Sequence, residues 1–257
     1  PLAHIDYDLM PAILTIDAAM EASSFLGPPA QMKKGEPDKH LASASRKLSG
    51  RLYCGGQEHF YLEGQAALAI PGEDGDIQLY ASTQHPSEIQ HKVAEMLGVS
   101  SHAVTVETRR MGGAFGGKES QGNLPALTAA LAAHLTGRPA KTVYDRDDDF
   151  MLTGKRHDFR IDYEVGFEDD GRIEAVFFDQ ALRCGMSWDL SAAIAARAMC
   201  HADNAYEIPH MRITSYCCLT HTQSNTAFRG FGGPQGMLGI EPVSYTHLRA
   251  HETVYNL

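Results

Sequence analysis

The chain has 257 residues, of which 43% are hydrophobic and 21% charged, so it can bury a core and form one or two domains. Its formal net charge of −10 leaves no excess of lysine and arginine to neutralise a nucleic-acid backbone or an anionic membrane surface. No apolar stretch is long enough to span a bilayer, and the N-terminal residues lack the features of a signal peptide. These properties argue against nucleic-acid and membrane partners and indicate a cytoplasmic protein.

The first predicted elements are an extended, loop-rich segment over residues 1–50 and a mixture of strands and a loop over residues 55–64. A helix is predicted over residues 86–97. Pro86 suits its first position, and Gly98 suits the position just past its end.

A short strand at 104–106 leads into a glycine-rich loop at 111–119. A core helix is then predicted from Asn123, a suitable cap, to Gly137. The leucines on its predicted core face are Leu124, Leu127, Leu131 and Leu135.

The remaining chain predicts a β-hairpin, a helix, a strand and a second glycine-rich loop. The hairpin pairs residues 161–167 with 172–179, and the helix covers 191–203. The strand covers 213–219, and the second glycine-rich loop covers 228–234. Helices and strands without a regular βαβ alternation predict an α+β fold of mixed sheets with flanking helices.

The five cysteines are odd in number and form no Cys-x-x-Cys pair. This pattern argues against a disulfide framework, a zinc site and an iron–sulfur cluster in this chain. We interpret them as buried, reduced thiols. They are Cys54, Cys184, Cys200, Cys217 and Cys218.

The first glycine-rich loop nearly matches a nucleotide-binding P-loop, but Glu119 stands where a magnesium-binding hydroxyl is required. This disfavours a nucleotide hydrolase. The glycines can instead let the backbone approach a ligand and present N–H groups to its oxygen atoms, beside the rigid ring of Phe115. Taken alone, each loop could equally be a tight turn with its phenylalanine in the core.

Four segments together resemble the molybdopterin-binding subunit of the xanthine dehydrogenase family. They are Thr-Gln at 83–84, Arg-Met-Gly-Gly-Ala-Phe-Gly-Gly-Lys-Glu at 110–119, Arg-Ala-Met-Cys-His at 197–201 and Thr-Ala-Phe-Arg-Gly-Phe-Gly-Gly-Pro-Gln at 226–235. Their order and spacing agree with the family from about residue 11 to residue 241. The resemblance implies that residues 1–241 are the N-terminal part of a molybdopterin-binding region.

The family resemblance also implies a cofactor, a reaction and partners. The cofactor is molybdenum–molybdopterin, and the reaction is oxidation of a purine, xanthine or hypoxanthine, to urate. Electrons would pass to 2Fe–2S and FAD centres on partner subunits, in a hetero-oligomer when the protein is full length.

Specific residues carry over by position in the matched motifs. Gln84 matches a glutamine whose amide contacts the molybdenum centre, and Gly116 and Arg229 match further contacts around that centre. Phe115 matches a residue on the cofactor side of the pocket, where it borders both the molybdenum centre and the substrate. Phe231 matches the aromatic residue that packs against the substrate ring.

Glu119 and Arg197 match the acidic and basic residues that flank the purine, and they are the candidate catalytic residues. An arginine can stabilise negative charge that develops on a ring, and a carboxylate can accept hydrogen bonds from ring N–H groups. Related aldehyde oxidases generally carry apolar residues here, so the pair favours a purine over an aldehyde. Seen singly, Glu119 could be a solvated loop carboxylate and Arg197 an exposed helix residue.

Two alternative functions remain open, an aldehyde or other N-heterocycle hydroxylase subunit and a non-catalytic binding or assembly fragment. Residues 242–257 depart from the family pattern, and we interpret them as a non-homologous tail such as a translated junction. In the family, the glutamate that acts as general base comes from a later region, and no residue here matches it. We therefore expect no turnover by this fragment alone.

Overall fold

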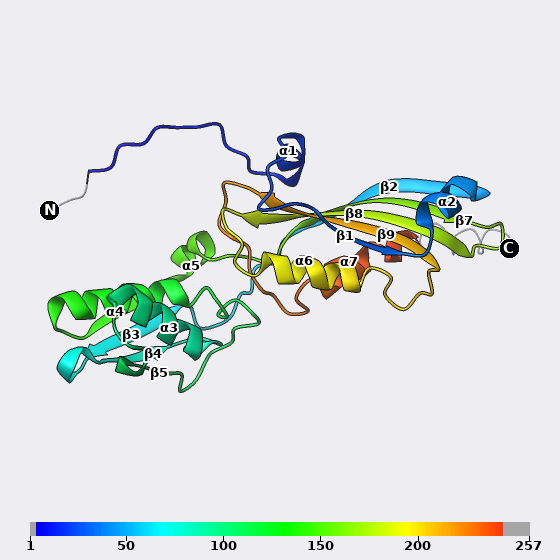
Figure 1. Ribbon diagram of the computed structural model, residues 1–257. Coiled ribbons are helices and arrows are strands. Elements are labelled where there is room, and N and C mark those ends of the chain that lie inside the picture. The colour runs from blue at the N-terminus through cyan, green and yellow to red at the C-terminus, as the bar shows by residue number, and fades with distance from the viewer. Residues whose placement is uncertain (1–3, 244–257) are drawn as a thin grey trace.

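The computed structural model describes residues 4–243 and arranges them around two sheets (Figure 1). The larger sheet has five strands in the order β1-β9-β8-β7-β2, and the smaller has four in the order β5-β4-β3-β6. The larger sheet consists of β1 (Ala30–Lys34), β2 (Arg46–Cys54), β7 (Phe159–Phe167), β8 (Ile173–Gly185) and β9 (His210–Leu219). The smaller consists of β3 (Ala66–Pro71), β4 (Ile77–Ala81), β5 (Val104–Glu107) and β6 (Ala140–Val143).

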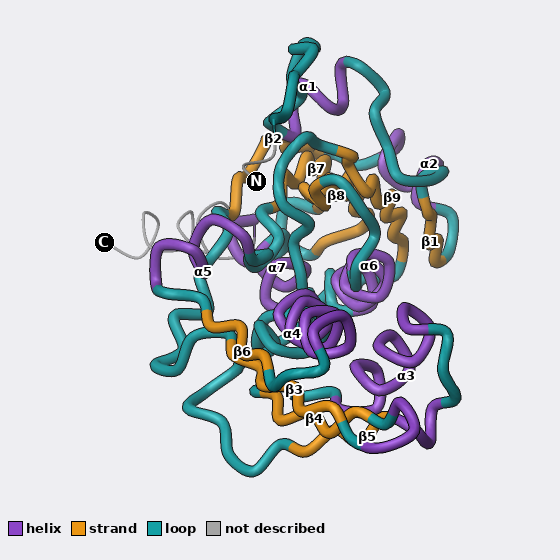
Figure 2. The backbone as a smooth tube through the Cα atoms, turned by 90° about the vertical axis from the view of Figure 1, so that its left-hand side faces the viewer, coloured by secondary structure: helices purple, strands orange, loops and turns teal. Residues whose placement is uncertain are grey.

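Helices flank both sheets (Figures 1 and 2). The helices are α1 (Ile16–Glu21), α2 (Pro37–Ser43), α3 (Pro86–Leu97), α4 (Asn123–Thr136), α5 (Arg146–Leu152), α6 (Ser191–Cys200) and α7 (Gly233–Leu238), with short 3-10 turns η1 (Glu73–Gly75) and η2 (Ser101–Ala103). In the larger half, α6 packs on β9 with α7 beside it, while α1 and α2 cover the opposite face. In the smaller half, α3 and α4 pack on the sheet.

Both sheets are mixed, as an α+β fold predicts. The parallel pair β4–β5 is connected through α3, and the parallel pair β8–β9 is connected through α6. A helical crossover is the usual way to join parallel neighbours, because a tight turn cannot return the chain to the same end of the sheet. The other strand pairs are antiparallel.

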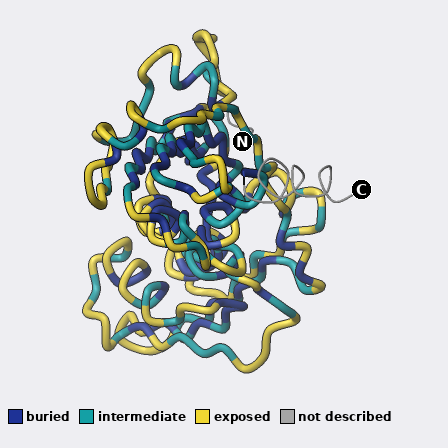
Figure 3. The backbone as a smooth tube through the Cα atoms, turned by 90° about the vertical axis from the view of Figure 1, so that its right-hand side faces the viewer, coloured by how far each residue is buried: buried dark blue, intermediate teal, exposed yellow. Residues whose placement is uncertain are grey.

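The two halves have separate hydrophobic cores. In the larger half, Phe159 and Phe178 of the sheet pack with Ile194 of α6. In the smaller half, Leu79 packs with Ile89 of α3 and with the alanines of α4. Figure 3 shows the buried stretches inside both halves, with exposed stretches around them. Burial of these two apolar clusters is the main contribution to the stability of each half.

Most elements predicted after residue 85 are confirmed. Helix α3 begins at Pro86 and ends before Gly98, whose φ of 68° gives the left-handed cap that glycine favours. Strands β7 and β8 form the predicted antiparallel hairpin around residues 168–172. The predicted helix at 191–203 is present as α6, although it ends three residues earlier.

The prediction of a loop-rich segment over residues 1–50 is wrong, because α1, β1 and α2 lie within it. The hydroxyl of Thr15 accepts a hydrogen bond from the N–H of Ala18 and so caps α1. Pro37 occupies the first turn of α2. Helices this short depend on packing against the larger sheet, which local sequence does not reveal.

The predicted leucine face of α4 is wrong for three of its four leucines. The exposed fractions are 56% for Leu124, 41% for Leu131 and 73% for Leu135, whereas Leu127 is partly buried and packs against the core. The buried residues of the helix are instead Pro125, Ala126, Ala129, Ala130 and Ala133. Small side chains let α4 approach β3 closely, so the packing distance selects alanine for the core face. Gly122, not Asn123, takes the N-cap position.

The structure has all five cysteines free. The prediction of buried thiols holds for Cys184 and Cys218, whereas Cys54 and Cys217 are half-buried and Cys200 is exposed at the end of α6. Across residues 4–243, no group of three or more His, Cys, Asp or Glu side chains could hold a metal ion. Over the same range, no helix is both long and apolar enough to cross a membrane. The tail from residue 244 onward lies outside the described residues, so its interpretation stays a prediction.

We expect Ala130→Leu to lower the free energy of unfolding by about 1–3 kcal/mol, because Ala130 is fully buried and a larger side chain would overpack the core. Leu135→Lys should change it by less than about 0.5 kcal/mol, because Leu135 is 73% exposed. Urea unfolding followed by circular dichroism measures both. A larger loss for Leu135→Lys would show that the leucine face is the packed one.

His157 makes the stability of the chain dependent on pH. Its side chain is fully buried, and its Nε2 is hydrogen-bonded to Ser191 Oγ at 2.7 Å. Burial, with a smaller effect of Arg183, lowers its pKa to about 3. Because the unfolded histidine has a pKa of about 6.5, the unfolded chain binds the extra proton first as the pH falls.

The contribution of His157 should therefore be complete above about pH 6.5 and should decline below it by roughly 1 kcal/mol per pH unit, until the pH approaches the folded pKa. Urea unfolding between pH 7.5 and 5 measures this slope. His157→Gln should flatten it, whereas His134→Gln, at an exposed position of α4, should leave it unchanged. An equal slope in all three proteins would contradict the assignment to His157.

Candidate functional site

The two glycine-rich loops, far apart in sequence, lie against each other. We call residues 111–119 the first glycine loop and residues 226–234 the second. The N–H of Arg229 donates to the carbonyl oxygen of Phe115 at 3.0 Å. Just past the first loop, the hydroxyls of Ser120 and Thr226 are hydrogen-bonded at 3.1 Å. The two loops therefore form one surface.

Gly116 lies at the closest approach of the two loops. A Cβ atom there would lie 2.6 Å from the carbonyl oxygen of Ala227, which is shorter than any normal contact. Its φ of +100° is also a conformation that side chains disfavour. Any other residue at 116 would push the loops apart.

Gln84 is fixed by the first glycine loop. Its side-chain oxygen accepts from the N–H groups of Gly116 at 2.9 Å and Lys118 at 3.3 Å, and its own N–H donates to the carbonyl oxygen of Lys118 at 2.9 Å. Two backbone donors identify which end of the amide is oxygen. The exposed amide NH₂ group makes no hydrogen bond to residues 4–243, so it is available as a donor beside Gly116.

Phe115 and Phe231 both have left-handed backbone, with φ of 54° and 48°. Such conformations cost about 1–3 kcal/mol for a non-glycine residue and persist where surrounding contacts enforce them. Phe115 is 50% exposed, so its interpretation as a core residue of a tight turn is wrong. A strained backbone that presents an exposed ring is typical of a binding surface.

Arg197 lies beside the second glycine loop. It projects from α6 at an exposed position, and its guanidinium carbon is 5.5 Å from the centre of the Phe231 ring. Helix α6 can approach this closely because Gly232 lacks a side chain, and a Cβ there would lie 2.2 Å from the carbonyl oxygen of Ile194. Arg197 and Phe231, which the resemblance named separately, therefore lie in contact.

Glu119 ends the first glycine loop, where its N–H donates to the carbonyl oxygen of Gly116 at 3.3 Å. Its half-buried carboxylate makes no hydrogen bond or ion pair to the rest of the described chain. No direct contact joins Glu119 to Arg197, so their placement on two sides of one substrate stays a prediction.

Lys118 does not occupy the position of a phosphate-binding lysine. Its side chain is fully buried, and Nζ donates to Ser82 Oγ at 2.8 Å and lies 3.3 Å from Glu63 Oε2. Nζ also lies 4.7 Å from the centre of the Tyr61 ring. Burial lowers the pKa of Lys118, and the nearby Glu63 carboxylate opposes this change. With its amine enclosed, Lys118 cannot reach a nucleotide, which agrees with rejection of the P-loop interpretation.

A further set of residues at the site, His59, Tyr61 and Glu63, was missed by the sequence analysis. His59 Nε2 is 2.6 Å from the carbonyl oxygen of Ala227, and Glu63 Oε2 accepts from the N–H of Gly112 at 2.7 Å. Their partners lie about 50 to 170 positions away in the sequence, so no local pattern identifies them.

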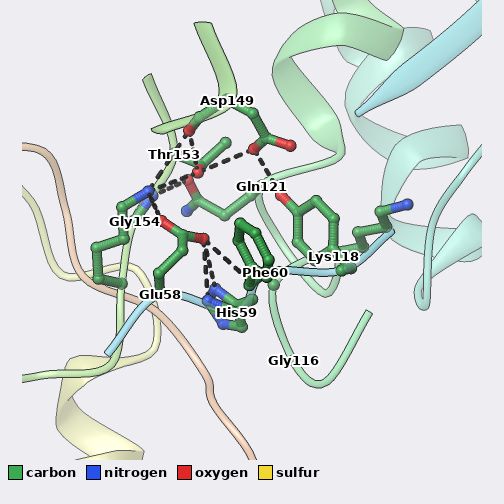
Figure 4. A network of polar contacts seen from close by, with 12 residues as sticks. Glu58, His59, Phe60, Gly116, Lys118, Gln121, Asp149, Thr153 and Gly154 are labelled. Atoms are coloured by element: carbon green, nitrogen blue, oxygen red, sulfur yellow. Dashed lines mark hydrogen bonds and ion pairs between the residues drawn. The ribbon is translucent and has the colours of Figure 1, made fainter. Parts of the chain in front are cut away.

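A buried polar network around Asp149 lies next to these residues (Figure 4). The Tyr61 hydroxyl donates to Asp149 Oδ1 at 2.6 Å, and Thr153 Oγ1 donates to the Asp149 carbonyl oxygen at 2.6 Å. Burial raises the pKa of Tyr61, and the bond to Asp149 raises it further. Glu58 Oε1 accepts from the backbone N–H of His59 at 2.9 Å (Figure 4).

The geometry suits a cofactor that is held by amide and guanidinium donors rather than by a ring of protein metal ligands. The donor of Gln84 and the exposed ring of Phe115 border the junction of the two loops, and Arg229 is exposed in the second loop. The N–H groups of Gly112, Gly116 and Lys118 are already bonded to Glu63 and Gln84, so the amide NH₂ of Gln84 and the guanidinium of Arg229 are the donors that favour anionic or oxygen-bearing groups. The residues matched by resemblance are thus consistent with a molybdenum–molybdopterin group.

The chain is similar to curated xanthine dehydrogenases. The chain is 48% identical over 238 residues to xanthine dehydrogenase/oxidase of Mus musculus, which covers 92% of this chain and 18% of the relative. It is 44% identical over 242 residues to xanthine dehydrogenase of Oryza sativa subsp. japonica, which covers 93% of this chain and 18% of the relative. The chain therefore spans about a fifth of the length of these relatives.

Solved structures show the same fold. The aldehyde oxidoreductase from Desulfovibrio gigas matches with a TM-score of 0.83 and 24% identity, over 94% of this chain and 28% of that chain. Quinoline 2-oxidoreductase from Pseudomonas putida 86 matches with a TM-score of 0.81 and 21% identity, over 95% of this chain and 33% of that chain. At this level of identity, the likeness concerns the fold alone.

The sequence also matches the molybdopterin cofactor-binding domain family over residues 21–244. This match covers most of the chain, including both glycine loops, Gln84 and α6. This chain belongs to the molybdopterin cofactor-binding domain family.

Proposed function

We propose that this chain forms one wall of the molybdenum–molybdopterin site in a purine-oxidising hydroxylase of the xanthine dehydrogenase type. The observation that carries the proposal is the assembly of Gln84, the first glycine loop and the second glycine loop by direct hydrogen bonds. These segments were matched to the family separately, and in the folded chain they lie together. The long relatives, xanthine dehydrogenases at 44–48% identity, support the same reaction class.

Gln84, Phe115, Gly116 and Arg229 would hold the cofactor in this proposal. The Gln84 amide supplies a fixed donor, and Gly116 supplies close backbone approach. When bound, the group supplies two-electron oxidation of an electron-poor C–H carbon. The exposed ring of Phe115 would exclude water from that side of the pocket.

Phe231 and Arg197 would bind the purine. A flat ring that packs on Phe231 lies within reach of the Arg197 guanidinium, because the two side chains are already in contact. The guanidinium can stabilise negative charge on the ring, and the unpaired Glu119 carboxylate can accept from ring N–H groups. These two charged side chains favour a purine over an aldehyde or another N-heterocycle.

The complete reaction needs parts that this chain does not supply. No residue here matches the general base of the family, so the chain alone is proposed to be inactive. We propose that 2Fe–2S and FAD centres on partner subunits or domains accept the electrons, in a cytoplasmic hetero-oligomer. A non-catalytic assembly role is the alternative, and a chain that retains no molybdenum would favour it.

Gln84→Ala should reduce the retained molybdenum and pterin about tenfold. The substitution removes the amide NH₂ donor from the site, and it also removes the oxygen that accepts from the N–H groups of Gly116 and Lys118. Elemental analysis and pterin fluorescence per chain measure this, after production in a host that makes molybdopterin. Gln31→Ala, at an exposed position of β1, is the control and should match the unmodified chain. Equal retention in both variants would contradict the role of Gln84.

Arg197→Met, in an enzyme that contains this chain together with its remaining parts, should lower kcat/KM for xanthine about a hundredfold. Aldehyde oxidation should change by less than about threefold, because an aldehyde offers no ring charge to stabilise. Arg138→Met, at an exposed position next to β6, is the control. Equal losses on both substrates would overturn the purine assignment.

A further inference from the structure

Residues 59–63 form an irregular segment with a buried and an exposed side, with a φ of 49° at Phe60 and a bend at Leu62 and Glu63. His59 and Tyr61 are 5% and 1% exposed, whereas Phe60 and Leu62 are 69% and 91% exposed. The first glycine loop contacts His59, Tyr61 and Glu63, so these three residues share the inner side. We call these three residues the brace.

The first glycine loop lies directly on the brace. A Cβ atom at Gly112 would lie 2.6 Å from Glu63 Cβ, and one at Gly117 would lie 2.6 Å from His59 Cγ and 2.8 Å from Tyr61 Cε1. Glycine at these two positions is therefore required by neighbouring protein atoms. At these two positions the glycines therefore admit another part of the chain, whereas the sequence analysis interpreted the glycines of this loop as admitting a ligand or forming a tight turn.

Hydrogen bonds fix the same contact. Glu63 Oε2 accepts from the N–H of Gly112 at 2.7 Å, and the N–H of Glu63 donates to the carbonyl oxygen of Gly112 at 3.1 Å. Burial raises the pKa of the Glu63 carboxyl, but the bonds from Gly112, Ser82 and Lys118 outweigh it and lower the pKa. Glu63 therefore stays ionised and holds the start of the loop at neutral pH.

His59 also contacts the second glycine loop. Its Nε2 lies 2.6 Å from the carbonyl oxygen of Ala227, which requires the proton on that nitrogen. Its ring centre is 4.8 Å from that of Phe228. One buried imidazole thus packs against Gly117 of one loop and bonds to Ala227 of the other. Figure 4 shows His59 and Gly116 in this region.

The outer side of the segment is held by Arg146. Its Nη2 donates to the carbonyl oxygens of Tyr61 at 2.7 Å and Leu62 at 3.0 Å. Its guanidinium carbon also lies 5.4 Å from the centre of the Phe60 ring. Because residues 59–63 belong to neither sheet, these bonds satisfy carbonyl groups that a strand ladder would otherwise satisfy, and they hold the segment at its bend.

We propose that His59, Tyr61 and Glu63 are positioning residues that act as one unit and set the spacing between the two glycine loops. They fix that spacing in the chain itself, so the donors of both loops are pre-organised before any ligand binds. The expected effect of this spacing on cofactor binding rests on the proposed function. The spacing itself is a property of the folded chain and does not depend on that function.

Hydrogen exchange of the 257-residue chain tests this unit without any cofactor. The reporting amides are Gly112, bonded to Glu63, and Arg229, bonded across the loops to Phe115. His59→Leu should speed exchange at both about tenfold, because it removes a buried hydrogen bond. Glu63→Met should do the same at both sites. Leu62→Ala, on the exposed side of the segment, should leave both unchanged.

The conservative variants separate positioning from general destabilisation. His59→Gln keeps a donor near the position of Nε2 and should restore slow exchange, whereas His59→Asn is too short to reach Ala227 and should not. Protection of the β8 amides reports whether each variant is folded, and any variant that loses it is replaced by His59→Asn or Glu63→Ala. Slow exchange at Arg229 in folded His59→Leu or His59→Asn would overturn the proposal. An effect of Glu63→Met confined to Gly112 would also overturn the single unit.

The outcome for the brace is distinguishable from the outcome for the proposed function. If the unmodified chain retains no pterin while His59→Leu loosens both loops, the cofactor role is wrong and the brace stands. If pterin is retained equally by the unmodified chain and His59→Leu, and exchange is also unchanged, the brace is wrong and the cofactor role stands. In a positive result, His59→Leu both loosens the loops and retains about tenfold less pterin, and His59→Gln recovers both properties.

Discussion

The backbone hydrogen bond from Arg229 to Phe115 is the contact on which the site depends. It joins a loop that follows the smaller sheet to a loop that follows the larger one. Gly116 makes the contact possible, because no side chain fits against Ala227 at that distance. The donor of Gln84, the ring of Phe115 and the Arg197–Phe231 pair all take their places relative to this junction.

Sequence patterns predicted the elements whose ends carry strong signals, such as α3 between Pro86 and Gly98. They failed where the distance between packed elements decides which side chains are buried. Leucine is more hydrophobic than alanine, so the leucine face of α4 was expected to be buried, but close approach to β3 admits only small side chains. The short helices near the N-terminus were missed for a related reason, since their stability comes from the larger sheet.

The sequence motifs predicted only part of the site. Resemblance identified Gln84, Phe115, Gly116 and Arg229, and the structure brings them together. It did not identify His59, whose partner Ala227 is 168 positions away. A single sequence offers no signal for contacts at such separation, and along 59–63 the apolar Phe60 and Leu62 are the exposed residues, opposite to what hydrophobic patterning predicts. The relation of Glu119 to Arg197 stays a prediction, because no direct contact joins these two residues of the described chain.

The separate cores of the two halves have a consequence for how the chain melts. Each half can lose its packing without exposing the apolar cluster of the other, so the boundary between them is a natural place for stepwise unfolding. The two glycine loops lie at that boundary. A ligand that contacts both loops would bind only when both halves are folded. Binding would then stabilise the two halves together, and their two unfolding transitions would become one.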